Sequence, residues 1–259
     1  MDTLPRDWPE WLETVKTFSL SDFLAWALRT FSPDLAFSTS LGREDQLLLW
    51  HLDQTVATLG LSPKSLDIFT LDTGRLHPAT YELWEANRST FRLPVRGVYP
   101  EASAVETYVN TQGINGFYRS LESRKACCQV RKVEPLKRAL KGKRAWITGR
   151  RADQAATRQK LPLLEWDSAF GLIKINPLAE WTQQQIEAEI AVHKIPVSVL
   201  HAQGYPSIGC APCTRPIADG EEERAGRWWW ENPEHKECGL HLAVEPKFRF
   251  QREKAHGPS

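Results

Sequence analysis

The chain has 259 residues, of which 41% are hydrophobic, and a formal net charge of +1. This length supports one large α/β domain or two small ones, and the balanced charge argues against a dedicated nucleic-acid binder. The first residues lack the apolar core of a signal peptide, and no apolar run reaches membrane-spanning length. We therefore expect a cytoplasmic protein that has neither a membrane nor a nucleic acid as its partner.

Short apolar runs alternate with amphipathic segments along the chain. The runs that suit strands are 34–38, 65–72, 94–98, 144–148 and 171–175. The segments that suit helices are 19–31, 44–59, 77–91, 131–141 and 182–194. The alternation predicts an α/β fold, with a mostly parallel sheet and helices on both of its faces. Such sheets bind ligands beyond the carboxyl ends of their strands, so the turns after Phe37, Leu71 and Ile147 are candidate pocket walls.

The character of the sequence changes at about Gly204, where it becomes rich in turn residues and loses any clear period. We predict that residues 1–203 form the α/β domain. Residues 204–259 are predicted to be an irregular C-terminal segment over the ligand-binding end of the sheet. This segment need not be an independent domain.

Five cysteines stand in three places: Cys127 next to Cys128, a CxxC at Cys210 and Cys213, and Cys238 alone. In a reducing compartment, metal ligation or redox chemistry is favoured over a disulfide framework. The first four suit a tetrathiolate site. Neighbours on a helix point about 100° apart, which favours a wide iron–sulfur cluster, although the spacing alone leaves a zinc ion nearly equal.

Cys238 lies in the sequence ECGLH, so His241 follows three residues later and is able to stabilise a thiolate. The charged neighbours of Cys238 and the adjoining Gly239 favour an exposed, reactive thiol. The alternative is a small buried apolar side chain. Position alone does not decide between the two.

Eight segments together carry a resemblance to a known family. They are STSLGREDQ (38–46), LDTGRLHP (71–78), RKACCQVRKVEPL (124–136), TGRRADQAATR (148–158), NPLAEW (176–181), GYPSIGCAPCTRP (204–216), GEEERAGRWWWE (220–231) and KECGLH (236–241). In this order, they resemble the assimilatory adenylyl-sulfate reductases within the phosphoadenylyl-sulfate reductase family. The resemblance covers residues 37 to 241.

The resemblance implies a sheet related to the adenine-nucleotide alpha-hydrolases. It implies reduction of adenylyl sulfate to sulfite and AMP in assimilatory sulfate reduction, with thioredoxin or glutaredoxin as reductant. Cys238 would be the nucleophile and would form an S-sulfocysteine intermediate. Phosphoadenylyl sulfate, or both nucleotides, remains the alternative substrate, and a homo-oligomer remains open.

The resemblance also implies one 4Fe–4S cluster. Its ligands would be Cys127, Cys128, Cys210 and Cys213.

Cationic groups are expected near the bound sulfate, because an anionic thiolate must approach an anionic substrate. The candidates are Lys132, Arg158, Arg224 and Arg227. Lys132 lies four residues after Cys128, so a helix would turn both toward one side. The arginines would be ordinary surface residues without the resemblance.

Other predicted substrate contacts are Ser38, Ser40, Leu71 and Gly149, where a glycine lets the backbone approach the nucleotide. The loop after the first strand lacks the SGGxDS of pyrophosphate-releasing relatives, which argues against a tRNA-sulfur enzyme. The small net charge argues against a metal-binding nucleic-acid sensor.

Overall fold

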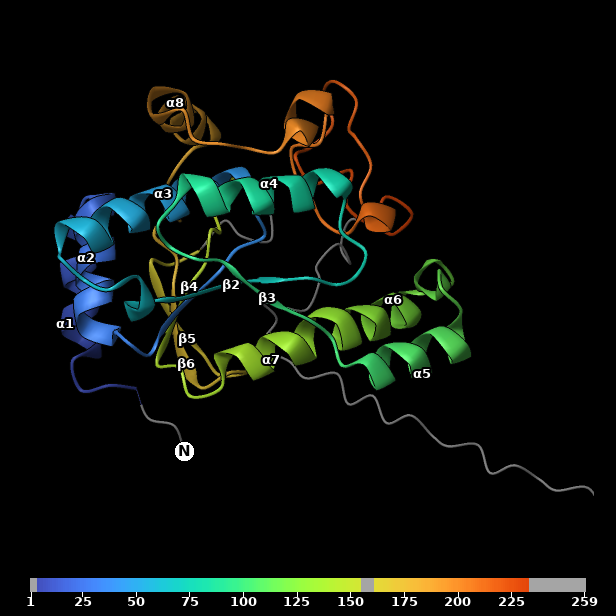
Figure 1. The fold of residues 1–259 in the computed structure, drawn as a ribbon, viewed down its shortest axis with the longest axis horizontal. Coiled ribbons are helices and arrows are strands. Elements are labelled where there is room, and N and C mark those ends of the chain that lie inside the picture. Colours follow the sequence, from blue (N-terminus) through green and yellow to red (C-terminus); the bar gives the residue numbers. More distant parts are fainter. Residues whose placement is uncertain (1–3, 155–160, 233–259) are drawn as a thin grey trace, which may run out of the picture.

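The computed structural model describes residues 4–154 and 161–232. Six strands form one sheet in the order β3-β2-β1-β4-β6-β5 (Figure 1). Their bounds are β1 (Leu35–Ser38), β2 (Asp67–Leu71), β3 (Arg96–Val98), β4 (Ala145–Ile147), β5 (Leu164–Asp167) and β6 (Leu172–Ile175). Every neighbouring pair is parallel except β5 with β6. The predicted mostly parallel sheet is therefore confirmed.

Helices cover both faces of the sheet, as predicted. Their bounds are α1 (Trp8–Thr14), α2 (Leu20–Phe31), α3 (Arg43–Thr58), α4 (Pro78–Thr90), α5 (Ala102–Gln112), α6 (Leu121–Cys128), α7 (Glu134–Leu140) and α8 (Gln183–His193). In Figure 1, α3 and α4 lie above the sheet, and α5, α6 and α7 lie below it. None of the described helices is both long and apolar enough to cross a membrane.

Alternation along β1 divides the interior into two cores. Leu35 and Phe37 belong to the larger core, which includes the apolar faces of α2 and α3. Ala36 points to the smaller core, where it meets Leu136 of α7 and Trp146 of β4. Successive side chains of a strand point to opposite faces, so one short apolar strand serves both layers.

The predicted helix starts are confirmed at two caps. The Ser19 side chain accepts a hydrogen bond from the backbone of Asp22 at the start of α2. Thr182 and Gln185 form a reciprocal capping box at the start of α8. Such caps satisfy backbone N–H groups that have no partner within the helix.

The helices α1, α5 and α6 and the strand β5 were not predicted, and their apolar patterns are weak. No residue of α1 is buried, and Tyr108 is the buried residue of α5. The edge strand β5 has the mixed sequence LEWD. The predicted helix 131–141 is also longer than expected, because α6, a π-helical turn (Gln129–Val133) and α7 follow one another without a break.

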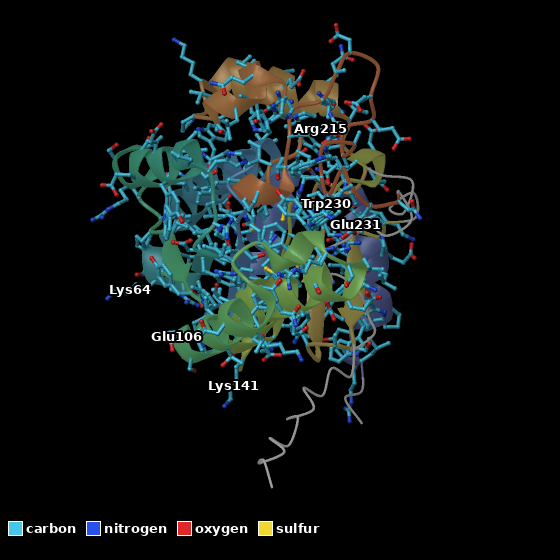
Figure 2. All side chains as sticks on the ribbon, turned by 90° about the vertical axis from the view of Figure 1, so that its right-hand side faces the viewer. Lys64, Glu106, Lys141, Arg215, Trp230 and Glu231 are labelled. Carbon is cyan, nitrogen blue, oxygen red and sulfur yellow. The ribbon has the colours of Figure 1, made fainter. Side chains whose placement is uncertain are left out.

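Residues 204–232 hold few regular elements and pack beside the turn that follows β2. The backbone N–H of Ala211 donates to the carbonyl of Arg75, and Thr214 forms an isolated bridge with Arg227. Figure 2 shows Trp230 and Glu231 within the outline of the molecule, while Lys141 projects from its rim. The division at residue 203 and the closing of the C-terminal segment over the sheet stay predictions.

Candidate functional site

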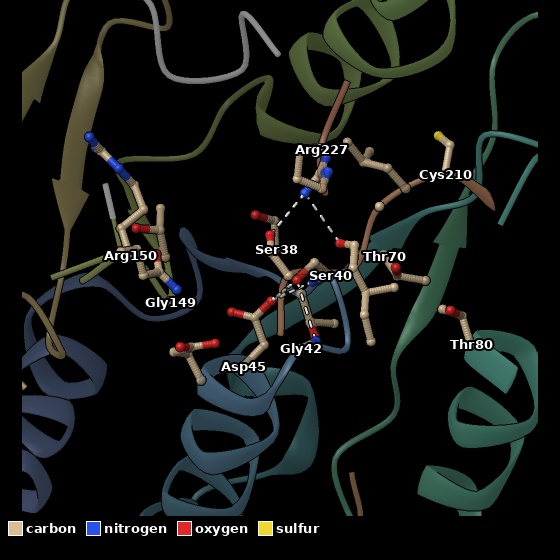
Figure 3. A pocket seen from close by; sticks show the side chains of 18 of the residues that line it. Ser38, Ser40, Gly42, Asp45, Thr70, Thr80, Gly149, Arg150, Cys210 and Arg227 are labelled. Atoms are coloured by element: carbon tan, nitrogen blue, oxygen red, sulfur yellow. Dashed lines mark hydrogen bonds between the residues drawn. The ribbon is translucent and has the colours of Figure 1, made fainter. Parts of the chain in front are cut away.

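A pocket, here called the strand-end pocket, opens at the carboxyl ends of β1, β2 and β4 (Figure 3). Its walls include Ser38 from β1, Leu71 from β2 and Thr148 directly after β4. The chain runs from β1 to β2 and β3 on one side and reaches β4 on the other. The strand order therefore reverses beside β1, and a pocket at such a reversal follows from the topology.

The loop after β1 is fixed by the carboxylate of Asp45, which lies in the first turn of α3. Its Oδ2 accepts hydrogen bonds from the backbone N–H of Ser40 at 2.5 Å and from the Ser40 hydroxyl at 2.7 Å. Burial raises the pKa of Asp45 to about 7, although the two bonds from Ser40 act to lower it. Asp45 thus shapes the loop and exchanges its proton near neutral pH.

Gly149 is required by a close approach between this loop region and the turn after β4. A Cβ atom at position 149 would lie 2.1 Å from Oδ1 of Asp45 and 3.3 Å from Cβ of Glu44. Any side chain there would have to displace the buried Asp45 carboxylate. The glycine therefore brings the β4 turn and the start of α3 to the same wall of the pocket.

The Arg151 guanidinium joins three elements at the rim of the strand-end pocket. It is 1% exposed and pairs with Glu44 of α3 at 2.8 Å and with Glu223 of the C-terminal segment at 3.1 Å. Burial and the negative charge of Glu44 raise the pKa of Glu223 to about 7, against the lowering effect of Arg151. This ion network holds the segment bearing Arg224 against the β4 turn.

Four cationic side chains, those of Lys132, Arg150, Arg224 and Arg227, line the strand-end pocket, and that of Arg150 is paired with Glu165 at 2.6 Å. Nη1 of Arg227 lies 3.4 Å from both the Ser207 hydroxyl and the Ile208 carbonyl. These long contacts hold the guanidinium beside the opening drawn in Figure 3. Positive groups fixed in this way are suited to an anionic ligand.

A second cavity, here called the cysteine cavity, is lined by Cys127, Cys128, Cys210 and Cys213. The first two end α6, directly before the π-helical turn, and the other two flank a turn in the C-terminal segment. Adjacent cysteines therefore do reach one cavity. π-Helical turns inside helices are frequent at functional sites, and this one also brings Lys132 to both cavities.

The thiols of the cysteine cavity differ in their surroundings. Burial raises the pKa of Cys210, but the charge of Lys132 and the contact with Thr73, at 3.2 Å, bring it below its ordinary value. Burial and the neighbouring Cys210 raise the pKa of Cys213 to about 12. Cys210 is therefore the thiol that loses its proton more readily.

Trp228 forms another wall of the cysteine cavity and is almost fully buried. The guanidinium carbons of Arg124 and Arg227 each lie 4.7 Å from its ring centre. Its backbone adopts a φ of 43°, which a bulky residue rarely does. Its buried Nε1 has no hydrogen-bond partner among the described residues.

These features fit a sulfur-rich metal centre. Four thiols share one cavity with nearby cations and with the Trp228 N–H, which has no acceptor among residues 4–154 and 161–232, and these groups suit a negatively charged cluster. Within the described ranges, no group of three or more His, Cys, Asp or Glu side chains is arranged to hold a single metal ion.

The predicted site residues fall into two groups in the structure. Those that line the strand-end pocket are Ser38, Ser40, Leu71, Lys132, Gly149, Cys210, Arg224 and Arg227. The four paired cysteines line the cysteine cavity. Cys238, His241 and Arg158 lie outside the described residues.

Sequence reasoning missed Asp45 and Trp146, which line the strand-end pocket, and Arg151, which pairs with Glu44 at its wall. Asp45 looked like an ordinary acidic residue in the first turn of a helix. Trp146 looked like a core residue of a strand. The hydrogen bonds and ion pairs of these side chains connect them to other elements or to turns. No local sequence pattern indicates such contacts.

The chain is similar to several known proteins. Residues 34–216 match the family described as phosphoadenosine phosphosulfate reductase domain. The chain is 52% identical to an adenosine 5′-phosphosulfate reductase of Allochromatium vinosum, over 80% of this chain and 78% of that protein. It is 51% identical to one of Sinorhizobium fredii, over 80% of each.

One solved structure with the same fold is a phosphoadenylyl-sulfate reductase from Candida auris, in a phosphate complex. It has a TM-score of 0.68 and 28% identity, over 83% of this chain and 98% of the other.

Proposed function

Because the chain belongs to the phosphoadenosine phosphosulfate reductase family, we propose that it reduces adenylyl sulfate to sulfite and AMP. The observation that carries the proposal is the meeting of the two cavities. Lys132 and Cys210 line both the strand-end pocket and the cysteine cavity, next to the cationic Arg227. Identity of about 50% to adenosine 5′-phosphosulfate reductases supports this choice of substrate.

In the first step, the thiolate of Cys238 attacks the sulfur atom of the bound sulfuryl group. The new S–S bond forms as the bond between sulfur and the bridging oxygen breaks, and that electron pair leaves with AMP. The enzyme then carries an S-sulfocysteine. Negative charge grows on the phosphate, so Lys132, Arg224 and Arg227 would stabilise the transition state.

In the second step, one thiolate of a dithiol protein attacks the Cys238 sulfur and expels sulfite. The second thiol then breaks the mixed disulfide and restores the Cys238 thiol. The dithiol is oxidised to a disulfide and supplies the two electrons of the reduction. Thioredoxin is the proposed reductant, with glutaredoxin as the other dithiol protein of this kind.

We also propose one 4Fe–4S cluster on Cys127, Cys128, Cys210 and Cys213. When bound, it would supply a rigid anchor and a negatively charged centre that Lys132 offsets. Iron and acid-labile sulfide analysis tests this part separately. Sulfide and iron near four atoms each per chain would support the cluster, and zinc without sulfide would overturn it.

The remaining parts of the proposal concern the rest of the chain. Residues 204–259 would form a C-terminal segment that closes for the attack of Cys238 and opens for the dithiol protein, with Arg158 and His241 contributing near the sulfate and the thiol. The expected location is the cytoplasm, where thioredoxin is reduced. A homo-oligomer is compatible with this account, and gel filtration tests it.

The experiment is a sulfite assay with adenylyl sulfate, thioredoxin and thioredoxin reductase. The wild-type protein should release sulfite, and Cys238→Ser should release none while it keeps the iron and its visible absorbance. Turnover by the Ser variant would contradict the mechanism. Absence of sulfite with the iron-loaded wild type would contradict the function itself.

Phosphoadenylyl sulfate is the second candidate substrate, favoured by the likeness to the Candida auris enzyme. Its identity of 28% is well below the 52% shared with the Allochromatium vinosum protein. We therefore expect higher kcat/KM with adenylyl sulfate. Equal values for the two nucleotides would replace the proposal by dual specificity.

A further inference from the structure

We propose that Trp146 is a positioning residue that fixes the direction in which the Ser38 hydroxyl donates its hydrogen bond. The inference rests on the proposed function, because the acceptor would be an anionic oxygen of the phosphate–sulfate group of adenylyl sulfate. Trp146 and Ser38 both line the strand-end pocket, from the neighbouring strands β4 and β1.

The contact between the two side chains has only one possible direction. Nε1 of Trp146 lies 2.8 Å from the Ser38 hydroxyl oxygen. An indole nitrogen donates and never accepts, so the serine oxygen must be the acceptor. The single hydrogen of the Ser38 hydroxyl is thereby turned away from Trp146.

That hydrogen has no acceptor within the protein as described. Across residues 4–154 and 161–232, the only side-chain hydrogen bond of Ser38 is the one that it accepts from Trp146. Because the Ser38 oxygen also forms part of the pocket wall, a ligand oxygen is the natural acceptor.

Trp146 itself is held firmly, so the serine must adapt to the indole. The Trp146 side chain is 1% exposed and meets Phe170 edge-on, with ring centres 5.7 Å apart. Nζ of Lys174 lies 5.1 Å from the centre of the Trp146 ring and pairs with Asp167 at 2.5 Å. Separating the buried lysine from this carboxylate would be strongly unfavourable, and the lysine charge over the ring keeps the indole in place.

Ser40 of the same loop shows the opposite arrangement. Its hydroxyl donates to Asp45, and its backbone N–H donates to the same carboxylate oxygen. The hydrogen of Ser40 is therefore already used within the loop. Of the two serines, Ser38 is therefore the one whose hydroxyl is able to donate to an anion. The sequence alone does not distinguish them.

The test removes the indole N–H and keeps an aromatic ring. Binding of adenylyl sulfate is measured by calorimetry, without reductant, in the iron-loaded Cys238→Ser protein, which cannot turn over. Trp146→Phe should weaken binding roughly fivefold, because the Ser38 hydroxyl regains its freedom to rotate. Ser38→Ala should weaken binding about tenfold, the usual scale for a hydrogen bond to a charged group. The visible absorbance of the metal centre should not change.

The matched control is Trp84→Phe, which removes the bond from Trp84 Nε1 to the Val95 carbonyl, outside both cavities. It should leave binding unchanged. In the Ser38→Ala background, Trp146→Phe should have no further effect, because its action would pass through the hydroxyl. If the Phe variant does not fold, benzothienylalanine incorporated at position 146 removes the N–H and keeps the ring shape.

An equal loss with and without the Ser38 hydroxyl would overturn the proposal, as would unchanged binding in Trp146→Phe. These outcomes are distinct from a failure of the proposed function. Tight binding of adenylyl sulfate without sulfite release by the wild type would remove the reductase activity alone. If the Cys238→Ser protein did not bind adenylyl sulfate, both the proposed function and the role given to Trp146 would be contradicted.

Discussion

The strand-end pocket and the cysteine cavity share Lys132 and Cys210, but the chain builds them by different means. The pocket follows from the backbone, since β1, β2 and β4 all end at the same edge of the sheet. The cysteine cavity depends on individual side chains from α6 and from residues 210–213. These two segments lie about eighty positions apart in the chain.

This difference predicts that single substitutions should be able to change nucleotide binding and metal binding independently. A pocket made by strand order should survive the loss of most single side chains that line it. A metal centre held by four thiols should be lost with any one of them. Lys132, which lines both, is where damage to one region should reach the other.

The largest expected effect is that of Cys213→Ala, a residue that lines the cysteine cavity and not the strand-end pocket. Iron and sulfide should be lost completely, because three thiols remain. Calorimetry should still detect binding of adenylyl sulfate, because the strand ends are unchanged. Loss of nucleotide binding together with the iron would show that the two regions form one unit.

Arg151→Met should lower the free energy of unfolding by about 3 kcal/mol, because it leaves the carboxylates of Glu44 and Glu223 without their partner. Urea unfolding measures the change. Arg88→Met is the control, since its pair with Glu85 is exposed and should contribute less than about 1 kcal/mol. Equal effects in the two variants would contradict the role given to the buried network.

Lys132→Ala should lower kcat about a hundredfold, the usual cost of removing one group that stabilises a developing charge. Iron content should remain, because Lys132 is not a thiol ligand. Lys141→Ala, at an exposed position on the rim of the molecule, is the matched control and should leave kcat unchanged. Near-normal turnover in Lys132→Ala would contradict the proposal that Lys132 stabilises the transition state.

Asp45→Asn should change how stability depends on pH. The pKa of Asp45 is about 7 in the folded chain and 3.8 as a free side chain, so the folded state binds more protons between these values. Stability should therefore fall from about pH 4 to pH 7, by at most about 1.4 kcal/mol per pH unit. The Asn variant should lose this part of the slope.

The control for Asp45→Asn is Asp7→Asn, which changes an exposed carboxylate. Urea unfolding at several pH values measures both variants. An unchanged slope in Asp45→Asn would contradict the assignment of the proton to this buried group.

The sequence predicted the regular framework well, because β1, β2 and β4, and the helices α3 and α4 that follow the first two, carry clear apolar patterns. It also predicted where a pocket would open, since parallel strands end at one edge of a sheet. The spacing of Cys128 and Lys132 indicated a shared direction, which the π-helical turn modifies without separating the two residues.

Sequence reasoning could not predict the connections that prepare these side chains. The difference between Ser38 and Ser40 comes from Trp146 and Asp45, one on another strand and the other in the following helix. The pairing of Arg151 with Glu223 spans more than seventy positions in the chain. Such contacts are decided by packing in three dimensions, so they leave no periodic signal.

The most direct test of the account is mass spectrometry of the iron-loaded protein after mixing with adenylyl sulfate in the absence of any reductant. The account predicts one added sulfonate group, located on Cys238 by peptide mapping and removed as sulfite when thioredoxin is added. A protein that releases AMP without carrying this group, or that carries it on a residue other than Cys238, would contradict the account.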